Sequence, residues 1–259
     1  MNKEIHISLA AEELFHIGPF VVTNSLLVTW LVILALGIVA WLAGRKAKLV
    51  PRGLQNVFET VFEFLLTLIE SVTLSRKKAE KFFPLLATFF IFIFAANFTD
   101  IIPGIGTIGL YEITEHGKEF VPYFRPPTSD LNVTLALAVT TVVATQFFSI
   151  AALGFGKHIG KYFTFKGGPA HTFVGLLEAV SEVAKMVSFS FRLFGNIFAG
   201  EVLLTVIAVI VPFVAPLPFY LLELFVAFIQ ALVFTMLSLV FMTMATTSHE
   251  ELEEHVAHT

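Results

Sequence analysis

The sequence contains no cysteine and few charged residues. Without cysteine the chain can form no disulfide, no cysteine-ligated metal site and no thiol-based active site. Charged residues make up only 14% of the chain of 259 residues, whereas 56% of it is hydrophobic and 30 residues are phenylalanine. A soluble globular fold would leave too much of this apolar surface in water. The composition therefore indicates a polytopic membrane protein.

Three further features are missing. The first 20 residues hold Lys3 as their single cation, so they lack the positive region of a signal peptide, and we expect this tail to be retained. No internal repeat of the kind found in secondary transporters is visible. The eight histidines are scattered without a ligand spacing such as His-x-x-x-His. We therefore expect no metal site, no cofactor and no nucleic-acid partner.

Long apolar runs predict an all-α integral membrane protein with five membrane-crossing helices. Residues 53–75 instead place apolar side chains on one helical face and glutamates on the other, which predicts an amphipathic helix in the membrane interface. Residues 171–211 would form roughly 60 Å of helix, about twice the hydrocarbon thickness, so we expect the last two helices to form a long tilted hairpin. The segments expected within one membrane domain, 1–259, are an outside tail 1–25, spans 26–43, 82–102 and 131–153, hairpin arms 171–211 and 219–246, and a cytoplasmic tail 247–259.

The ends of two spans carry local signals. Pro84 is expected in the first turn of the span 82–102, where its missing N–H does no harm. Asp130 precedes the span 131–153 and is expected to cap it. Asp100 and Asn24 lie at span ends; we interpret Asp100 as a residue near water, and for Asn24 a place at headgroup level is as good a reading as a functional one.

The lysines and arginines predict the orientation of the chain. Of the 16 such residues, eleven fall in loops on one side, three fall on the other side (Lys3, Lys118 and Arg125) and two lie in the hairpin. Positively charged loops face the cytoplasm. We therefore expect the N-terminus outside and the C-terminus inside.

Arg192 lies in a run that otherwise resembles membrane interior, FSFRLFGNIFAGE from Phe189 to Glu201. A guanidinium cannot lose its proton in a protein, so it cannot become neutral in hydrocarbon as a lysine or a glutamate can. An arginine at the centre of a spanning helix costs about 2.5 to 3.5 kcal/mol on insertion scales. We therefore interpret Arg192 as a functional residue. The alternative is an arginine that extends to the membrane surface.

Other polar residues follow one face of the same arm. Glu178, Glu182, Lys185, Arg192 and Asn196 are spaced 4, 3, 7 and 4 residues apart, which places them along one stripe. The stripe predicts a polar track. For Glu182 and Lys185, a local ion pair is as good an interpretation as a role in ion conduction.

A second polar group is expected near the hairpin turn. Glu201 falls about 180 degrees from Arg192 around the helix, so this arm can meet two separate aqueous environments. In an antiparallel hairpin that turns near Pro212, Glu201 is level with Glu223 and Arg192 is level with Gln230. Two acids at one depth and an arginine near an amide at another favour a proton path over packing. We expect Glu201 and Glu223 to share a proton and to titrate as a unit.

A fixed positive charge between two polar tracks can control the protonation of a carboxylate that moves past it. A carboxylate on a moving partner would be ionised next to Arg192 and protonated in an apolar environment. The partner must be another chain, because no second part of this sequence supplies a mobile membrane carboxylate. Gly195, Ala199 and Gly200 are small residues that let another helix come close.

These residues resemble a known family. The motif FRLFGNIFAGE, from Phe191 to Glu201, is similar to the signature of subunit a of the F-type rotary ATP synthase. Residues 130–134, 178–181 and 230–244 fit its other segments, so the resemblance covers nearly the whole chain. In some members one position of the pair Glu201 and Glu223 is histidine, whereas here both are glutamate.

The resemblance implies an ion-translocating subunit without a nucleotide site of its own, in a bacterial inner membrane. Arg192 would face the essential carboxylates of a rotating ring of c subunits. The other implied partners are the peripheral-stalk subunit b, the rest of the ATP synthase and membrane lipid. Residues implied for the outside half-channel are Asn196, Glu201, Glu223 and Gln230, and those near the cytoplasmic half-channel are Glu178 and Ser181.

Two other classes of function compete with this one. A stand-alone secondary transporter or ion channel needs its own substrate site and usually repeated halves, and neither is visible. A membrane scaffold leaves Arg192 unexplained. Co-purification of an oligomeric proteolipid ring separates the first interpretation from these two.

Overall fold

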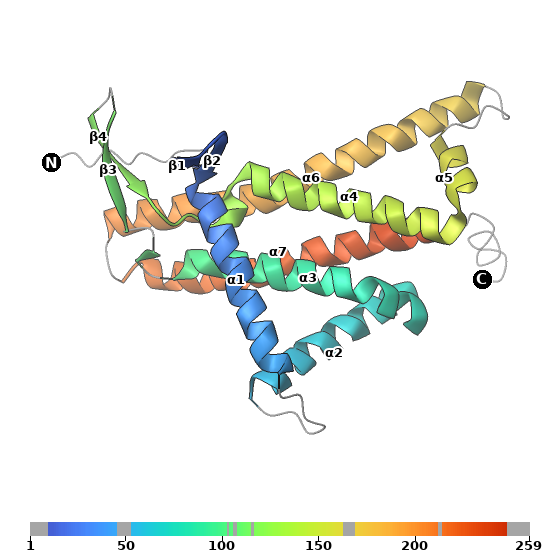
Figure 1. Ribbon diagram of the computed structural model, residues 1–259, viewed down its shortest axis with the longest axis horizontal. Coiled ribbons are helices and arrows are strands. Elements are labelled where there is room, and N and C mark those ends of the chain that lie inside the picture. Colours follow the sequence, from blue (N-terminus) through green and yellow to red (C-terminus); the bar gives the residue numbers. More distant parts are fainter. Residues whose placement is uncertain are drawn as a thin grey trace.

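The computed structural model describes residues 10–45, 53–102, 104–105, 108–114, 117–162, 169–211 and 214–247. This part of the chain forms seven α-helices and four short strands (Figure 1). Their order is β1 (Glu13–Ile17), β2 (Phe20–Thr23), α1 (Asn24–Gly44), α2 (Leu54–Thr73), α3 (Arg76–Ile101), β3 (Gly109–Thr114), β4 (Gly117–Pro122), the 3-10 helix η2 (Pro127–Ser129), α4 (Leu131–Leu153), α5 (Phe155–Tyr162), α6 (Pro169–Ile210) and α7 (Pro216–Thr246).

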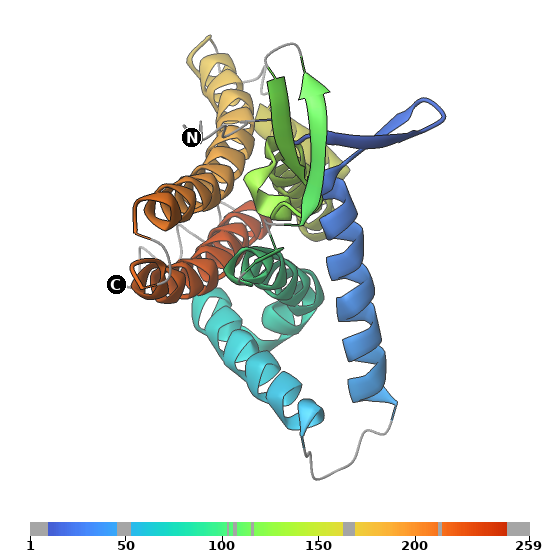
Figure 2. The same ribbon diagram turned by 90° about the vertical axis from the view of Figure 1, so that its left-hand side faces the viewer.

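Five of these helices are long and apolar enough to cross a membrane, namely α1, α3, α4, α6 and α7. Their number agrees with the five crossings expected from the apolar runs, and the all-α membrane fold is confirmed. Helices α3, α4, α6 and α7 run side by side along the length of the molecule, with α3 against α7 and α4 against α6 (Figure 1). Helix α1 leans away from this bundle (Figure 2). The bundle therefore positions the long pair α6 and α7.

Phenylalanine rings join the helices of the bundle. The ring of Phe234 in α7 lies 5.0 Å from that of Phe189 in α6 and 5.6 Å from that of Phe89 in α3. Aromatic pairs at such distances add roughly 0.5 to 1.5 kcal/mol each to the effect of burying their surface. Phenylalanine side chains therefore pack the core of the bundle as well as its lipid-facing surface.

Helix α2 has the expected amphipathic pattern. Leu65 and Ile69 are buried against the bundle, whereas Glu59 and Glu63 are exposed. Its location in the membrane interface stays a prediction.

Helix α3 begins earlier than the expected span. Ser75 caps it, accepting a hydrogen bond from the backbone N–H of Lys78, and the helix starts at Arg76. Pro84 therefore lies inside the helix, and the expectation that it occupies the first turn is wrong. A proline in this position leaves one backbone carbonyl of the preceding turn without its helical donor.

Two β-hairpins and the short helix α5 were not expected. Strands β1 and β2 pair in the N-terminal tail, and β3 and β4 pair in the loop after α3. Both hairpins lie at the same end of the bundle, and α5 lies at the other end (Figure 1). Each element is short, so it carries too few residues for its periodicity to stand out in a sequence dominated by apolar runs.

The hairpin end of the bundle is held by buried polar contacts. Asn24 is fully buried, and its Nδ2 donates to the Pro122 carbonyl at 3.1 Å and to a Glu12 carboxylate oxygen at 3.4 Å. Asp130 accepts from the Ser25 hydroxyl and, at 2.8 Å, from the backbone N–H of Asn132. The predicted cap of α4 is confirmed. Asn24 links α1 to the hairpins, and its place at headgroup level stays a prediction.

Some expected features lie outside the described residues. They are the first nine residues of the outside tail, the basic residues Lys46, Lys48, Arg52 and Lys166, Pro212 of the expected turn, and the cytoplasmic tail from residue 248 onward.

Candidate functional site

The site is built on the antiparallel pair α6 and α7. Helix α6 is continuous over 42 residues, and α7 returns beside it after the proline-containing turn. Pro216 and Pro218 lie in the first turn of α7, where a missing N–H is tolerated. Across the pair, Asn196 Nδ2 donates to Gln230 Oε1 at 2.8 Å, and Lys185 Nζ lies 4.8 Å from the centre of the Phe241 ring. Both contacts follow one register.

This register agrees with the expected one to within one helical turn. The Gln230 amide pairs with Asn196, one turn beyond Arg192 in α6, rather than with Arg192 itself. Glu223 faces Gly200, next to Glu201: a Cβ added to Gly200 would collide with the Glu223 carboxyl. Gly200 is therefore small because a side chain of α7 needs its space, whereas Gly195 and Ala199 are exposed.

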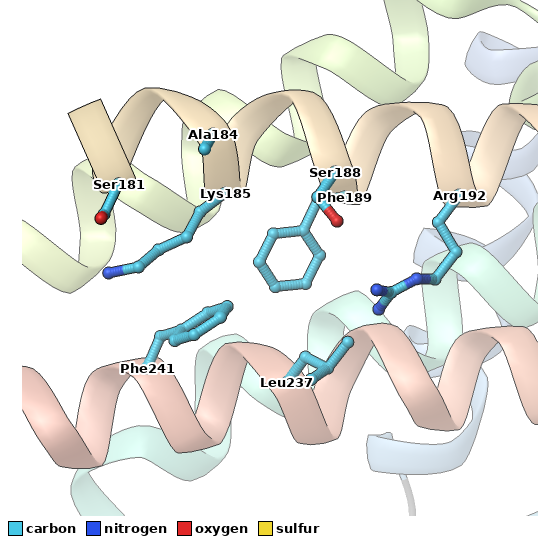
Figure 3. Close-up of a pocket in the computed structure, with 8 residues that line it drawn as sticks. All are labelled: Ser181, Ala184, Lys185, Ser188, Phe189, Arg192, Leu237 and Phe241. Atoms are coloured by element: carbon cyan, nitrogen blue, oxygen red, sulfur yellow. The ribbon is translucent and has the colours of Figure 1, made fainter.

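Arg192 is exposed on α6 beside a cavity of about 290 Å³ between α6 and α7. Figure 3 shows its guanidinium directed toward α7, with Lys185 and Ser181 on the same side of α6. Within the described part of the chain, Arg192 forms no ion pair with a carboxylate. The cavity is lined by Ser181, Ala184, Lys185, Ser188, Phe189, Arg192, Leu237 and Phe241.

The inner part of the polar stripe contains a local ion pair. Lys185 Nζ lies 2.8 Å from Glu182 Oε1, which confirms the ion pair as one of the two interpretations of these residues. The Ser181 hydroxyl donates to the Leu177 carbonyl within α6 and also borders the cavity. Glu178 is half-buried one turn earlier and is not among the described residues that line the cavity. A role for Glu178 and Ser181 in proton transfer stays a prediction.

Three carboxyl groups gather near the hairpin turn. Glu223 of α7 is buried, Glu201 of α6 is partly exposed, and Asp100 at the end of α3 lies close enough to interact electrostatically with both. The structure therefore adds Asp100, which lies at a helix end as expected, to the expected pair. One carboxylate oxygen of each acid is buried without a hydrogen-bond partner among the described residues. These oxygens can accept a hydrogen bond from water or a proton in transit.

A buried arginine stands beside these acids. Arg125 is 4% exposed, and its Nε lies 3.7 Å from Glu201 Oε2 and 3.1 Å from the Ser129 hydroxyl. The sequence had placed Arg125 among the solvated charges of an outside loop. No local signal marks it, because the contact joins the loop after β4 to a helix far along the chain.

The three acids and the cavity beside Arg192 lie at different positions along the length of α6. Nine residues separate Arg192 from Glu201, which is roughly 14 Å along the helix, and the Asn196–Gln230 pair lies between them. In the described ranges, no group of three histidine, aspartate or glutamate side chains has an arrangement that could hold a metal ion. The carboxyl groups near the turn can bind and release protons, whereas the guanidinium of Arg192 stays charged.

Comparisons with known proteins identify relatives of the chain. The family model described as ATP synthase A chain matches residues 26–243. The chain is 35% identical to ATP synthase subunit a of Moorella thermoacetica, over 92% of this chain and 97% of that protein. It is 39% identical to ATP synthase subunit a of Campylobacter jejuni, over 91% of this chain and 90% of that protein.

Proposed function

Because the chain belongs to the ATP synthase A chain family, we propose that it is the proton-conducting stator subunit of a rotary ATP synthase, in which Arg192 acts on the carboxylates of a rotating c ring. The observation that carries this proposal is the state of Arg192. It is exposed on an apolar helix and has no carboxylate partner in the described part of its own chain. A permanent charge in an apolar setting needs water or a partner group, and an acid from another chain would supply that partner.

The outer half-channel is formed by the carboxyls of Asp100, Glu201 and Glu223. Protons from outside water bind this group and pass along the Asn196–Gln230 pair toward the ring. A ring carboxylate that meets Arg192 is ionised, because a neighbouring opposite charge favours the charged form. Once it takes up a proton it is neutral and can move into lipid.

The cytoplasmic half-channel runs along the inner end of α6. Ser181 and Arg192 border the same cavity, and Glu178 lies one turn further in. Because the two half-channels meet α6 at different depths, a proton crosses only by riding on the ring. Each elementary charge gains about 2.3 kcal/mol per 100 mV of membrane potential, so a rotating ring that accumulates several steps suits the synthesis of one ATP.

The proposal also assigns partners and location. Gly195 and Ala199 are small and exposed on α6, which allows close approach of a c-ring helix. The peripheral-stalk subunit b completes the stator, and the complex lies in a bacterial inner membrane with the N-terminus of this chain outside. The chain itself needs no nucleotide site.

The test is ATP synthesis driven by a proton gradient in membrane vesicles that contain the assembled complex. We expect Arg192→Ala to reduce synthesis to background while the c ring still co-purifies. We expect Arg192→Lys to restore little of the rate, because a buried ammonium can lose its charge. The control is Arg76→Ala, which removes an exposed arginine that pairs with Glu70 and Glu80. Normal synthesis by Arg192→Ala, or a purified chain that transports protons without a ring, would refute the proposal.

A further inference from the structure

We propose that Arg125 is a positioning residue of the outer half-channel, whose fixed charge holds the Glu201 carboxylate and leaves the mobile proton to Asp100 and Glu223. This inference rests on the proposed function and concerns a residue that the polar stripe of α6 does not include. Arg125 lies in the loop between β4 and η2, at the end of the bundle where the hairpins meet.

The guanidinium is held by three separate segments. Its Nη1 donates to the Ala10 carbonyl at 2.6 Å in the N-terminal segment, and its Nε donates to the Ser129 hydroxyl at 3.1 Å in η2. The same Nε faces Glu201 Oε2 of α6 at 3.7 Å. The guanidinium of an arginine donates from a rigid planar fork and cannot lose its charge. Arg125 is therefore fixed in place before any proton arrives.

Burial gives this charge a strong effect on its neighbours. Arg125 is 4% exposed, so water screens it little. The titratable groups that face it or its partner are Glu201 on α6, Asp100 on α3 and Glu223 on α7, and Asp100 interacts with both glutamates. Three carboxyls in one poorly solvated place cannot all ionise at low cost.

The guanidinium of Arg125 makes the three carboxyl groups differ in how readily each one binds a proton. A positive charge beside Glu201 favours the ionised form of that carboxyl, and the contacts that it makes elsewhere keep it from moving to another acid. The proton that the group exchanges with water is then carried by Asp100 and Glu223. Glu223 is the member that packs against Gly200, one turn from the Asn196–Gln230 pair. A proton on Glu223 is therefore about one turn of α6 away from that pair.

The test is the pH profile of ATP-driven proton pumping by the assembled complex. Arg125→Gln removes the charge, and we expect the profile to shift by about one pH unit, a tenfold change in proton affinity. Arg125→Lys keeps the charge and should shift it by less than half as much. In a Glu201→Gln background, Arg125→Gln should produce no further shift, because the carboxylate on which it acts is gone. Arg76→Gln serves as the matched control and should leave the profile unmoved.

Two results would overturn the inference. One is a pH profile of pumping that Arg125→Gln leaves unmoved. The other is a shift of equal size with and without the Glu201 carboxylate. If Glu201→Gln pumps too slowly for a profile, Glu201→Asp replaces it, since the shorter side chain lengthens the 3.7 Å contact and should at least halve the shift. If the complex with Arg125→Gln fails to assemble, Arg125→Lys takes its place. The inference then requires that Arg125→Lys shifts the pH profile of pumping and that this shift disappears in the Glu201 variant. Pumping by Arg192→Ala would instead refute the proposed function, independently of these arms.

Discussion

At the scale of single residues, the acids near the hairpin turn provide the first prediction. Glu201→Gln and Glu223→Gln each remove one carboxylate from a group in which Asp100 interacts with both. If the group shares a proton, each change shifts the pH profile of proton pumping, and the effects of the double variant are clearly non-additive. The control is Glu80→Gln, an exposed acid that pairs with Arg76. Additive losses with unmoved profiles would show that each glutamate titrates alone.

The residues of the site differ in how far the sequence predicts them. Arg192 is evident because a charge that cannot be neutralised interrupts an apolar run. The register of two antiparallel helices, which the position of the turn fixes, predicts Gln230 level with Arg192. In the structure Gln230 pairs with Asn196, one turn further along α6. Arg125 and Asp100 do not follow from periodicity, because their places depend on how a loop and a helix end fold back onto α6. Contacts of this kind arise from tertiary packing.

At the scale of elements, the close approach of α6 and α7 gives a prediction for Gly200. A methyl group there would collide with the Glu223 carboxyl, so Gly200→Ala must displace either the carboxyl or the helix. The carboxyl is the far end of a flexible side chain, so it can move aside at little cost to stability. We expect slower proton pumping, because a carboxyl of the outer group is displaced, with at most a small fall in the temperature at which the chain is lost from the detergent-solubilised complex.

The matched control for Gly200→Ala lies in another apolar helix. A Cβ on Gly37 of α1 meets nothing within 4 Å, and alanine is the better helix former by roughly 1 kcal/mol. Gly37→Ala should therefore leave both measurements unchanged or raise the stability. Equal behaviour of the two variants would show that the Gly200 contact does not limit the packing of the hairpin.

The long helices follow from the sequence and the short elements do not. The apolar pattern of 171–211 predicts one uninterrupted arm, and α6 has no break from Pro169 to Ile210. The start of α3 was missed because the basic residues from Arg76 to Lys81 look like a loop, although the Ser75 cap already starts the helix there. Hairpin β3–β4 lies between two spans, in a segment for which the apolar runs predict no element.

At the scale of the whole molecule, the two ends of the bundle differ in kind. Both β-hairpins, Arg125 and the three acids lie at one end, whereas α5 and the start of α6 lie at the other (Figure 1). The α5 end carries six basic residues of the described chain, namely Arg76, Lys77, Lys78 and Lys81 in α3 and Lys157 and Lys161 in α5. The positive-inside rule assigns this end to the cytoplasm. The hairpin end should therefore face the outside, where protons enter during ATP synthesis.

Single cysteines can test this orientation, because the chain has none of its own. Phe20 in β2 is 75% exposed at the hairpin end, and Phe155 in α5 is 67% exposed at the other end. A membrane-impermeant maleimide should label Phe20→Cys in right-side-out vesicles and Phe155→Cys in inverted ones. Helices α1, α3 and α4 lie between the two positions, so an odd number of crossings must separate them. Reversed labelling would invert the proposed direction of proton flow through the two half-channels. Labelling of both positions from one side would mean that one of these three helices does not cross the membrane or that α2 does.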